Sequence, residues 1–122
     1  MFFPDFFYNF VKKEKIMVDI RILHTKEEYD SFINEDKVIV KFSADWCSPC
    51  RVLGSIINKL DPEKLNGYKF GEVNVEDDFA DDITRDLNIR NIPVCVYFNN
   101  SKEVKRTIGM LKAEDIYNNV IS

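Results

Sequence analysis

The sequence predicts an α/β fold in which parallel strands linked by helices are followed by an antiparallel hairpin and a last helix. The first observation is that apolar runs of strand length alternate with segments in which apolar residues recur every three to four positions. The second is that two strand-like runs, 94–98 and 103–108, are joined by the hairpin-type turn Asn99-Asn100-Ser101. The third is that 122 residues with 45% hydrophobic content suffice for one core without disulfide cross-links.

The expected elements follow the order βαβαβαββα. Thr25 with Glu28 is a capping box that begins the first helix, and Asp61-Pro62 ends the second. The strands are expected over 18–23, 38–44, 68–75, 94–98 and 103–108. The four helices are expected to bury these apolar residues in turn: Tyr29, Phe32 and Ile33; Val52, Leu53, Ile56, Ile57 and Leu60; Phe79, Ile83 and Leu87; Ile116, Tyr117, Val120 and Ile121.

The composition excludes several classes of function. A formal net charge of -4 argues against a general nucleic-acid binder, which normally carries a basic face. Three cysteines are too few and too unevenly spaced for a secreted disulfide scaffold. We therefore expect a cytoplasmic protein with no nucleic-acid partner.

The first 16 residues form a separate segment before the regular pattern begins at Met17. Their apolar side chains follow helical spacing at Phe3, Phe6, Phe7, Phe10 and Val11. Lys12 and Lys13 follow this stretch instead of preceding it, so it is not a secretory signal, and it is too short to span a bilayer. The alternatives are contact with a partner or a membrane surface, packing on its own domain, or translation that starts at Met17. The division is an extension over 1–16 and a domain over 17–122.

The strongest indication of chemistry follows the strand expected over 38–44, in the motif Trp46-Cys47-Ser48-Pro49-Cys50. Two thiols one helical turn apart at a strand-to-helix junction can close and open a disulfide ring with little backbone movement, which indicates redox chemistry. Half of a zinc site has the same spacing. The other candidate ligands are Cys95 and His24, with no second Cys-x-x-Cys pair, and we therefore expect no metal.

From about Met17 to Ser122 the chain resembles the thioredoxin family. The resemblance rests on the Trp46-Cys47-Ser48-Pro49-Cys50 motif, on Ile92-Pro93 before a strand, and on Ile108-Gly109 before the last helix. It implies the thioredoxin fold, in which helices flank a central mixed β-sheet, and it implies reduction of protein disulfides. It also implies a monomer that needs no cofactor of its own and is recharged by a thioredoxin reductase-like electron donor.

The resemblance assigns roles to the residues of the motif. Cys47 is the nucleophile, because backbone N–H groups and the positive end of the dipole at the start of a helix stabilise a thiolate. Cys50 is the resolving thiol, which attacks the mixed disulfide and releases a dithiol product. Pro49 suits the first turn of the helix, and Trp46 is expected to flank the site and help exclude water.

Pro93 is the second part of the site that the resemblance implies. In thioredoxins the matching proline follows a cis peptide bond and faces the active-site cysteines. The neighbouring backbone, here Ile92 and Val94, pairs with the substrate chain like an added strand. Because this pairing uses the backbone, Val94 in place of the usual threonine is expected to be tolerated.

The chain departs from the family at two charged positions. Thioredoxins usually carry a buried aspartate where this chain has Lys41, and commonly a lysine where it has Glu72. We expect Lys41 and Glu72 to form a swapped ion pair beneath the cysteines, because a charge in a central strand is costly unless paired. Glu72 would then exchange protons with Cys50, and Lys41 would favour the thiolate. The alternative is that Lys41 extends its ammonium to the edge of the sheet and has no chemical role.

Two other functions share this sequence pattern. One is a redox-inactive thioredoxin-fold binding subunit that docks through residues 1–16. The other is a disulfide-forming oxidant or isomerase, which would use the same cysteines at a different reduction potential. Ser48 replaces the more usual glycine between the cysteines, and the residues at this position influence that potential.

Overall fold

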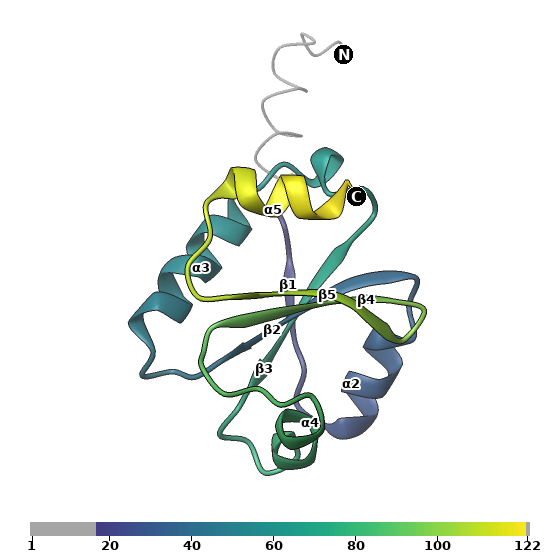
Figure 1. The fold of residues 1–122 in the computed structure, drawn as a ribbon, viewed down its shortest axis with the longest axis vertical. Helices are drawn as coiled ribbons and strands as arrows, with labels where there is room; N and C mark the ends of the chain where they lie inside the picture. The colour runs from purple at the N-terminus through teal and green to yellow at the C-terminus, as the bar shows by residue number, and fades with distance from the viewer. Residues whose placement is uncertain (1–16, 122) are drawn as a thin grey trace, which may run out of the picture.

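The structure of the protein, a computed structural model, describes residues 17–121, so the predictions for residues 1–16 lie outside the described residues. Five strands form one sheet in the order β1-β3-β2-β4-β5 (Figure 1). The predicted order of elements is confirmed, with one short 3-10 helix in addition. The bounds are β1 Ile20–Ile22, α2 Lys26–Ile33, β2 Lys37–Ser43, α3 Ser48–Asn58, η1 Pro62–Lys64, β3 Lys69–Asn74, α4 Ala80–Asp86, β4 Val94–Asn99, β5 Lys102–Ile108 and α5 Ala113–Val120.

The sheet is mixed, as the sequence predicts. Strand β3 pairs parallel with both β1 and β2, whereas β4 pairs antiparallel with both β2 and β5. Helices α3 and α5 cover one face of the sheet and α2 and α4 the other (Figure 1). The result is a three-layer arrangement in which β2, the central strand, is buried on both faces.

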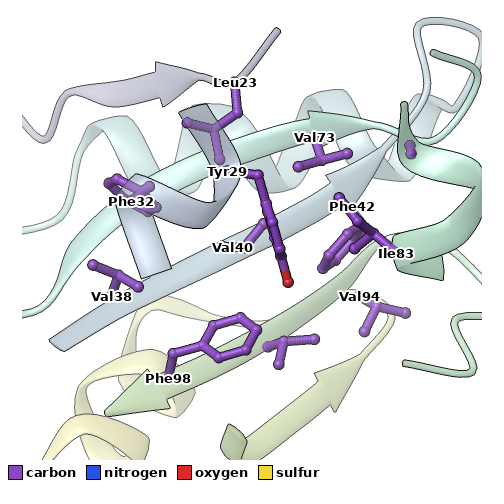
Figure 2. Packing of buried hydrophobic residues seen from close by; sticks show 12 residues of the cluster. Leu23, Tyr29, Phe32, Val38, Val40, Phe42, Val73, Ile83, Val94 and Phe98 are labelled. Atoms are coloured by element: carbon purple, nitrogen blue, oxygen red, sulfur yellow. The ribbon is translucent and has the colours of Figure 1, made fainter. Parts of the chain in front are cut away.

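The alternation of side chains along β2 assigns each residue to one of the two faces. Val38, Val40 and Phe42 join the core under α2 and α4, whereas Ile39 belongs to the core under α3 and α5. Figure 2 shows the first of these cores, where side chains from α2, α4 and the strands meet. Because side chains alternate along a strand, Lys41 lies on the α3 face with Ile39. This places a buried charged group on the same face of the sheet as the apolar core under α3 and α5.

The absence of a side chain at Gly71 lets α2 approach the sheet closely. A Cβ atom at Gly71 on β3 would lie 2.6 Å from the ring of Phe32 on α2. Phe32 itself is 1% exposed and packs within the core shown in Figure 2. The ring therefore occupies the space that any larger residue at position 71 would need.

Two residues predicted to face inward are exposed. Val52 on α3 is 51% exposed, and Ile121, which caps α5, is 70% exposed. Helix α3 begins at Ser48, and its inward face carries Leu53 and Ile57 while Val52 points about one quarter-turn away. Ile121 lies beyond the last turn of α5, where the chain no longer follows the helical face.

The turn between β4 and β5 has the predicted hairpin character. Asn100 and Ser101 have φ angles of 52° and 70°, the positive values that a type I′ turn requires at both central positions. The Ser101 hydroxyl also donates to the side-chain oxygen of Asn34 at 2.8 Å. At the start of α2 the Thr25 side chain accepts from the Glu28 backbone N–H as expected, but the Glu28 carboxylate accepts from His24 instead of Thr25.

Candidate active site

The two cysteines of the motif lie at the start of α3, directly after β2. Cys47 is the N-cap residue of the helix, and Cys50 lies within its first turn. Their sulfurs form a disulfide, and their Cα atoms are 5.2 Å apart. The backbone N–H of Cys50 donates to the Cys47 sulfur at 3.2 Å. One turn of helix thus supplies both the resolving position and a hydrogen bond to the sulfur of Cys47.

The surroundings of Cys47 favour a negatively charged sulfur. Helix α3 has 11 residues. Its first turn, which the structure describes in full, carries no acidic side chain that would offset the positive end of the helix dipole. Arg51 brings a guanidinium to the same turn, where it donates to the Ser48 hydroxyl at 3.1 Å and to the backbone oxygen of Asp45. Arg51 was not among the predicted site residues, although a basic residue directly after the second cysteine is a usable signal.

Trp46 lies beside the cysteines but is more exposed than a water-excluding lid would be. Trp46 is 65% exposed, and its indole N–H donates to the Glu76 carboxylate at 2.8 Å. The sequence pattern did not predict this contact. Glu76 therefore fixes the orientation of the exposed ring next to Cys47.

The segment before β4 packs against the cysteines. The Ile92–Pro93 peptide bond is cis, as the resemblance implied, and Ile92 contacts the small buried cluster that contains Cys47 and Cys50. The Pro93 carbonyl accepts from the Gly109 backbone N–H at 2.8 Å, and Val94 begins β4. A pocket of about 470 Å³ opens along this junction. It is lined by Trp46, Cys47, Ser48, Pro49, Arg90, Asn91 and Ile92.

Lys41 and Glu72 form the ion pair that the sequence analysis expected. The Lys41 Nζ lies 3.2 Å from a Glu72 carboxylate oxygen, and the two side chains are 4% and 25% exposed. The Lys41 side chain is buried, so its ammonium does not extend to the edge of the sheet, whereas its chemical role stays a prediction. Among the hydrogen bonds of the described residues, none joins either charged group to Cys47 or Cys50. The pair lies against α3 instead, close to Gly54.

The remaining candidates take no part in this arrangement. Cys95 lies opposite Lys41 on β4, and burial raises the pKa of its thiol to about 12, so that it stays protonated at neutral pH. Within residues 17–121 no group of three or more His, Cys, Asp or Glu side chains is arranged to hold a metal ion. In the same residues no helix has the length and apolar character needed to cross a membrane.

Comparison with known proteins agrees with this geometry. Residues 20–122 match the family model described as Thioredoxin. The chain is 33% identical to a thioredoxin of Mycoplasmoides gallisepticum over 92 residues, which are 75% of this chain and 89% of the relative. It is 36% identical to a thioredoxin of Mycoplasma genitalium over 107 residues, which are 85% of this chain and 100% of the relative.

A solved structure supports the fold independently. The oxidised thioredoxin of Plasmodium falciparum superposes with a TM-score of 0.73 at 22% identity, over 85% of this chain and 100% of that one. At 22% identity this structural similarity shows the fold alone. The family model and the two relatives show similarity of the sequence itself. Nothing in these comparisons favours a redox-inactive binding subunit. The chain therefore belongs to the thioredoxin family and is a thiol–disulfide oxidoreductase.

Proposed function

We propose that the protein reduces disulfides of other proteins in the cytoplasm, with Cys47 as the nucleophile and Cys50 as the resolving thiol. The observation that carries this assignment is the position of Cys47 at the N-cap of α3, where its sulfur accepts a hydrogen bond from the Cys50 backbone. The same N–H and the helix dipole would stabilise a Cys47 thiolate after reduction. Cys50 has no comparable position, because it lies inside the first turn and is 1% exposed.

The cycle transfers two electrons from the protein to its substrate. The Cys47 thiolate attacks one sulfur of a substrate disulfide, and the other substrate sulfur leaves as a thiolate and takes up a proton. Cys50 then loses its proton and attacks the Cys47 sulfur, which breaks the mixed disulfide and releases the second substrate thiol. The protein is left oxidised, with the Cys47–Cys50 disulfide that the structure contains. A flavin-containing thioredoxin reductase is the electron donor that the family resemblance supports.

The pocket beside the cysteines is the place proposed for the substrate chain. Its lining includes Trp46, Pro49 and Ile92 together with Cys47, so a segment lying in it would contact Cys47. An extended segment could pair with the backbone next to Pro93, in the manner of an added strand. Side-chain contacts with Val94 are not needed for this, since Val94 is 2% exposed.

Glu72 is proposed to exchange the proton of Cys50 through Lys41 and water. The two charged residues and Gly54 line a pocket of about 380 Å³ beside α3, which has room and polar partners for bridging water. Glu72 is the more exposed of the pair and can pass protons to the solvent. This pocket supports the proposal because it connects the solvent to the turn of α3 that follows Cys50.

Turnover with thioredoxin reductase and NADPH tests both the function and the proton path. The unmodified protein is expected to reduce a protein disulfide such as that of insulin, at a rate that depends on its concentration. Glu72→Gln is expected to lower turnover by at least about tenfold, because a positioned proton acceptor is lost. It is also expected to lower the pKa of Cys50, because the charge of Lys41 is then uncompensated. Glu114→Gln, at an exposed position on α5, serves as the matched control and is expected to have no effect.

Two outcomes of this assay would contradict the proposal at different levels. A protein that leaves insulin oxidised with every reductant would contradict the reductase function. A Glu72→Gln protein with unchanged turnover and unchanged thiol pKa values would remove the proton path alone.

A further inference from the structure

Helix α3 lacks a side chain at the point where it crosses the buried Lys41. A Cβ atom at Gly54 would lie 3.0 Å from the Lys41 Nζ, closer than such atoms normally approach. The ammonium therefore occupies space that an alanine at position 54 would contest. Glycine in the middle of a helix costs about 0.5–1 kcal/mol relative to alanine. This glycine is thus unfavourable for the helix itself and is explained by the room that it leaves for the ammonium.

This position brings the ammonium close to the redox pair. Gly54 follows Cys50 by four residues, so the two lie on the same face of α3 with Cβ positions about 5–6 Å apart. Adding the 3.0 Å between the Gly54 Cβ position and Nζ places the charge within about 9 Å of the Cys50 Cβ. Charges at such separations interact appreciably when the space between them is protein instead of water.

The carboxylate of Glu72 does not fully offset the positive charge of Lys41. Glu72 is 25% exposed and lines a pocket that opens to solvent, whereas Lys41 is 4% exposed. Water screens the carboxylate more than the ammonium. On the opposite side Lys41 faces Cys95, a thiol that burial keeps neutral by raising its pKa to about 12. Lys41 is therefore the less screened of the two paired charges, and its ammonium is the one that lies against Gly54 of α3.

We propose that Lys41, held in place by Gly54 and Glu72, raises the reduction potential of the Cys47–Cys50 pair. This inference rests on the proposed function and specifies what sets its driving force. Reduction adds two electrons, breaks the S–S bond and leaves two thiolate sulfurs. Cys50 takes a proton from water while Cys47 keeps its charge. A nearby cation stabilises this charged reduced form and not the neutral disulfide, so it favours the dithiol.

A double-mutant cycle between Lys41 and Gly54 tests the inference through the reduction potential. Each protein is equilibrated in graded glutathione buffers at pH 7, and the thiols are trapped and counted. Lys41→Met is expected to lower the dithiol-to-disulfide ratio about tenfold at a given buffer composition, equivalent to about 30 mV for a two-electron couple. Gly54→Ala is expected to shift the ratio in the same direction by about two- to threefold, because it displaces the ammonium without removing it.

The decisive comparison is Gly54→Ala in the Lys41→Met background, where it is expected to leave the ratio unchanged. Ser55→Ala, at the next position of α3 and in the same pocket, is the control and is expected to match the unmodified protein. If Lys41→Met does not fold, Lys41→Gln takes its place in the cycle.

A Gly54→Ala shift of equal size in both backgrounds would reveal an effect of the helix alone and overturn the inference. An unchanged potential in the Lys41 variant would overturn it too. An unmodified protein that never forms the disulfide would instead contradict the proposed function.

Discussion

Cys50→Ser is expected to stop the reaction after its first step, so that the protein accumulates as a mixed disulfide with its substrate. Cys47 keeps its N-cap position and the hydrogen bond from the backbone of residue 50, neither of which needs the second thiol. The attack on a substrate disulfide therefore proceeds, but no thiolate is left to resolve the product. Turnover is expected to fall by at least about 10³-fold. Non-reducing electrophoresis and intact mass spectrometry measure the adduct directly.

Two further serine variants separate the roles of the cysteines. Cys47→Ser is expected to form no adduct, since Cys50 is buried and lacks the N-cap environment. Cys95→Ser makes the same chemical change at a buried thiol outside the site and is expected to keep its turnover. An adduct that forms through Cys50 in the Cys47→Ser protein would reverse the assignment of nucleophile and resolving thiol.

Phe32→Ala is expected to lower the free energy of unfolding by about 3–5 kcal/mol, the typical cost of removing a buried aromatic ring. The ring is 1% exposed and joins α2 to the sheet at the place where Gly71 allows close approach. It also lies 5.0 Å from the guanidinium of Arg21, which covers its outer face. Its removal leaves a cavity that α2 cannot close without moving its remaining anchor, Tyr29. Urea unfolding followed by circular dichroism measures the change.

Gly71→Ala provides the matched test of this contact. In the unmodified protein the new methyl group meets the Phe32 ring and is expected to cost about 1–3 kcal/mol. In the Phe32→Ala background the methyl group enters the space that the ring has left, so this cost should disappear. If the changes in unfolding free energy of the two substitutions were additive, the contact with Phe32 would not be the reason that position 71 requires glycine.

The order and type of the elements could be predicted because their patterns are strong. Several local signals predicted a geometry that the folded protein retains. They are the capping residue Thr25, the apolar stripe with Leu53 and Ile57, and the Asn100-Ser101 turn. The exposed Val52 shows the limit of this reasoning. A helical stripe read from sequence is wider than the face that packs, and its edge depends on where the helix touches the sheet.

The active site was predictable to the extent that its residues form a contiguous motif or share a strand register. Cys47 and Cys50 follow from their spacing, and Lys41 and Glu72 are direct partners across β2 and β3. The contact between Trp46 and Glu76 could not be predicted, because it joins two loops whose approach depends on the whole fold. Gly54 was missed for another reason: an absent side chain leaves no mark in an apolar pattern.

The most direct test of the account is the reduction potential of the Cys47–Cys50 pair in the unmodified protein. Equilibration in graded glutathione buffers, followed by thiol trapping, gives this value. The proposed function predicts a potential near the -270 mV typical of thioredoxin, shifted upward by the roughly 30 mV that Lys41 is expected to contribute. A potential close to -120 mV, as in a strong disulfide-forming oxidant, would contradict the proposed direction of electron flow.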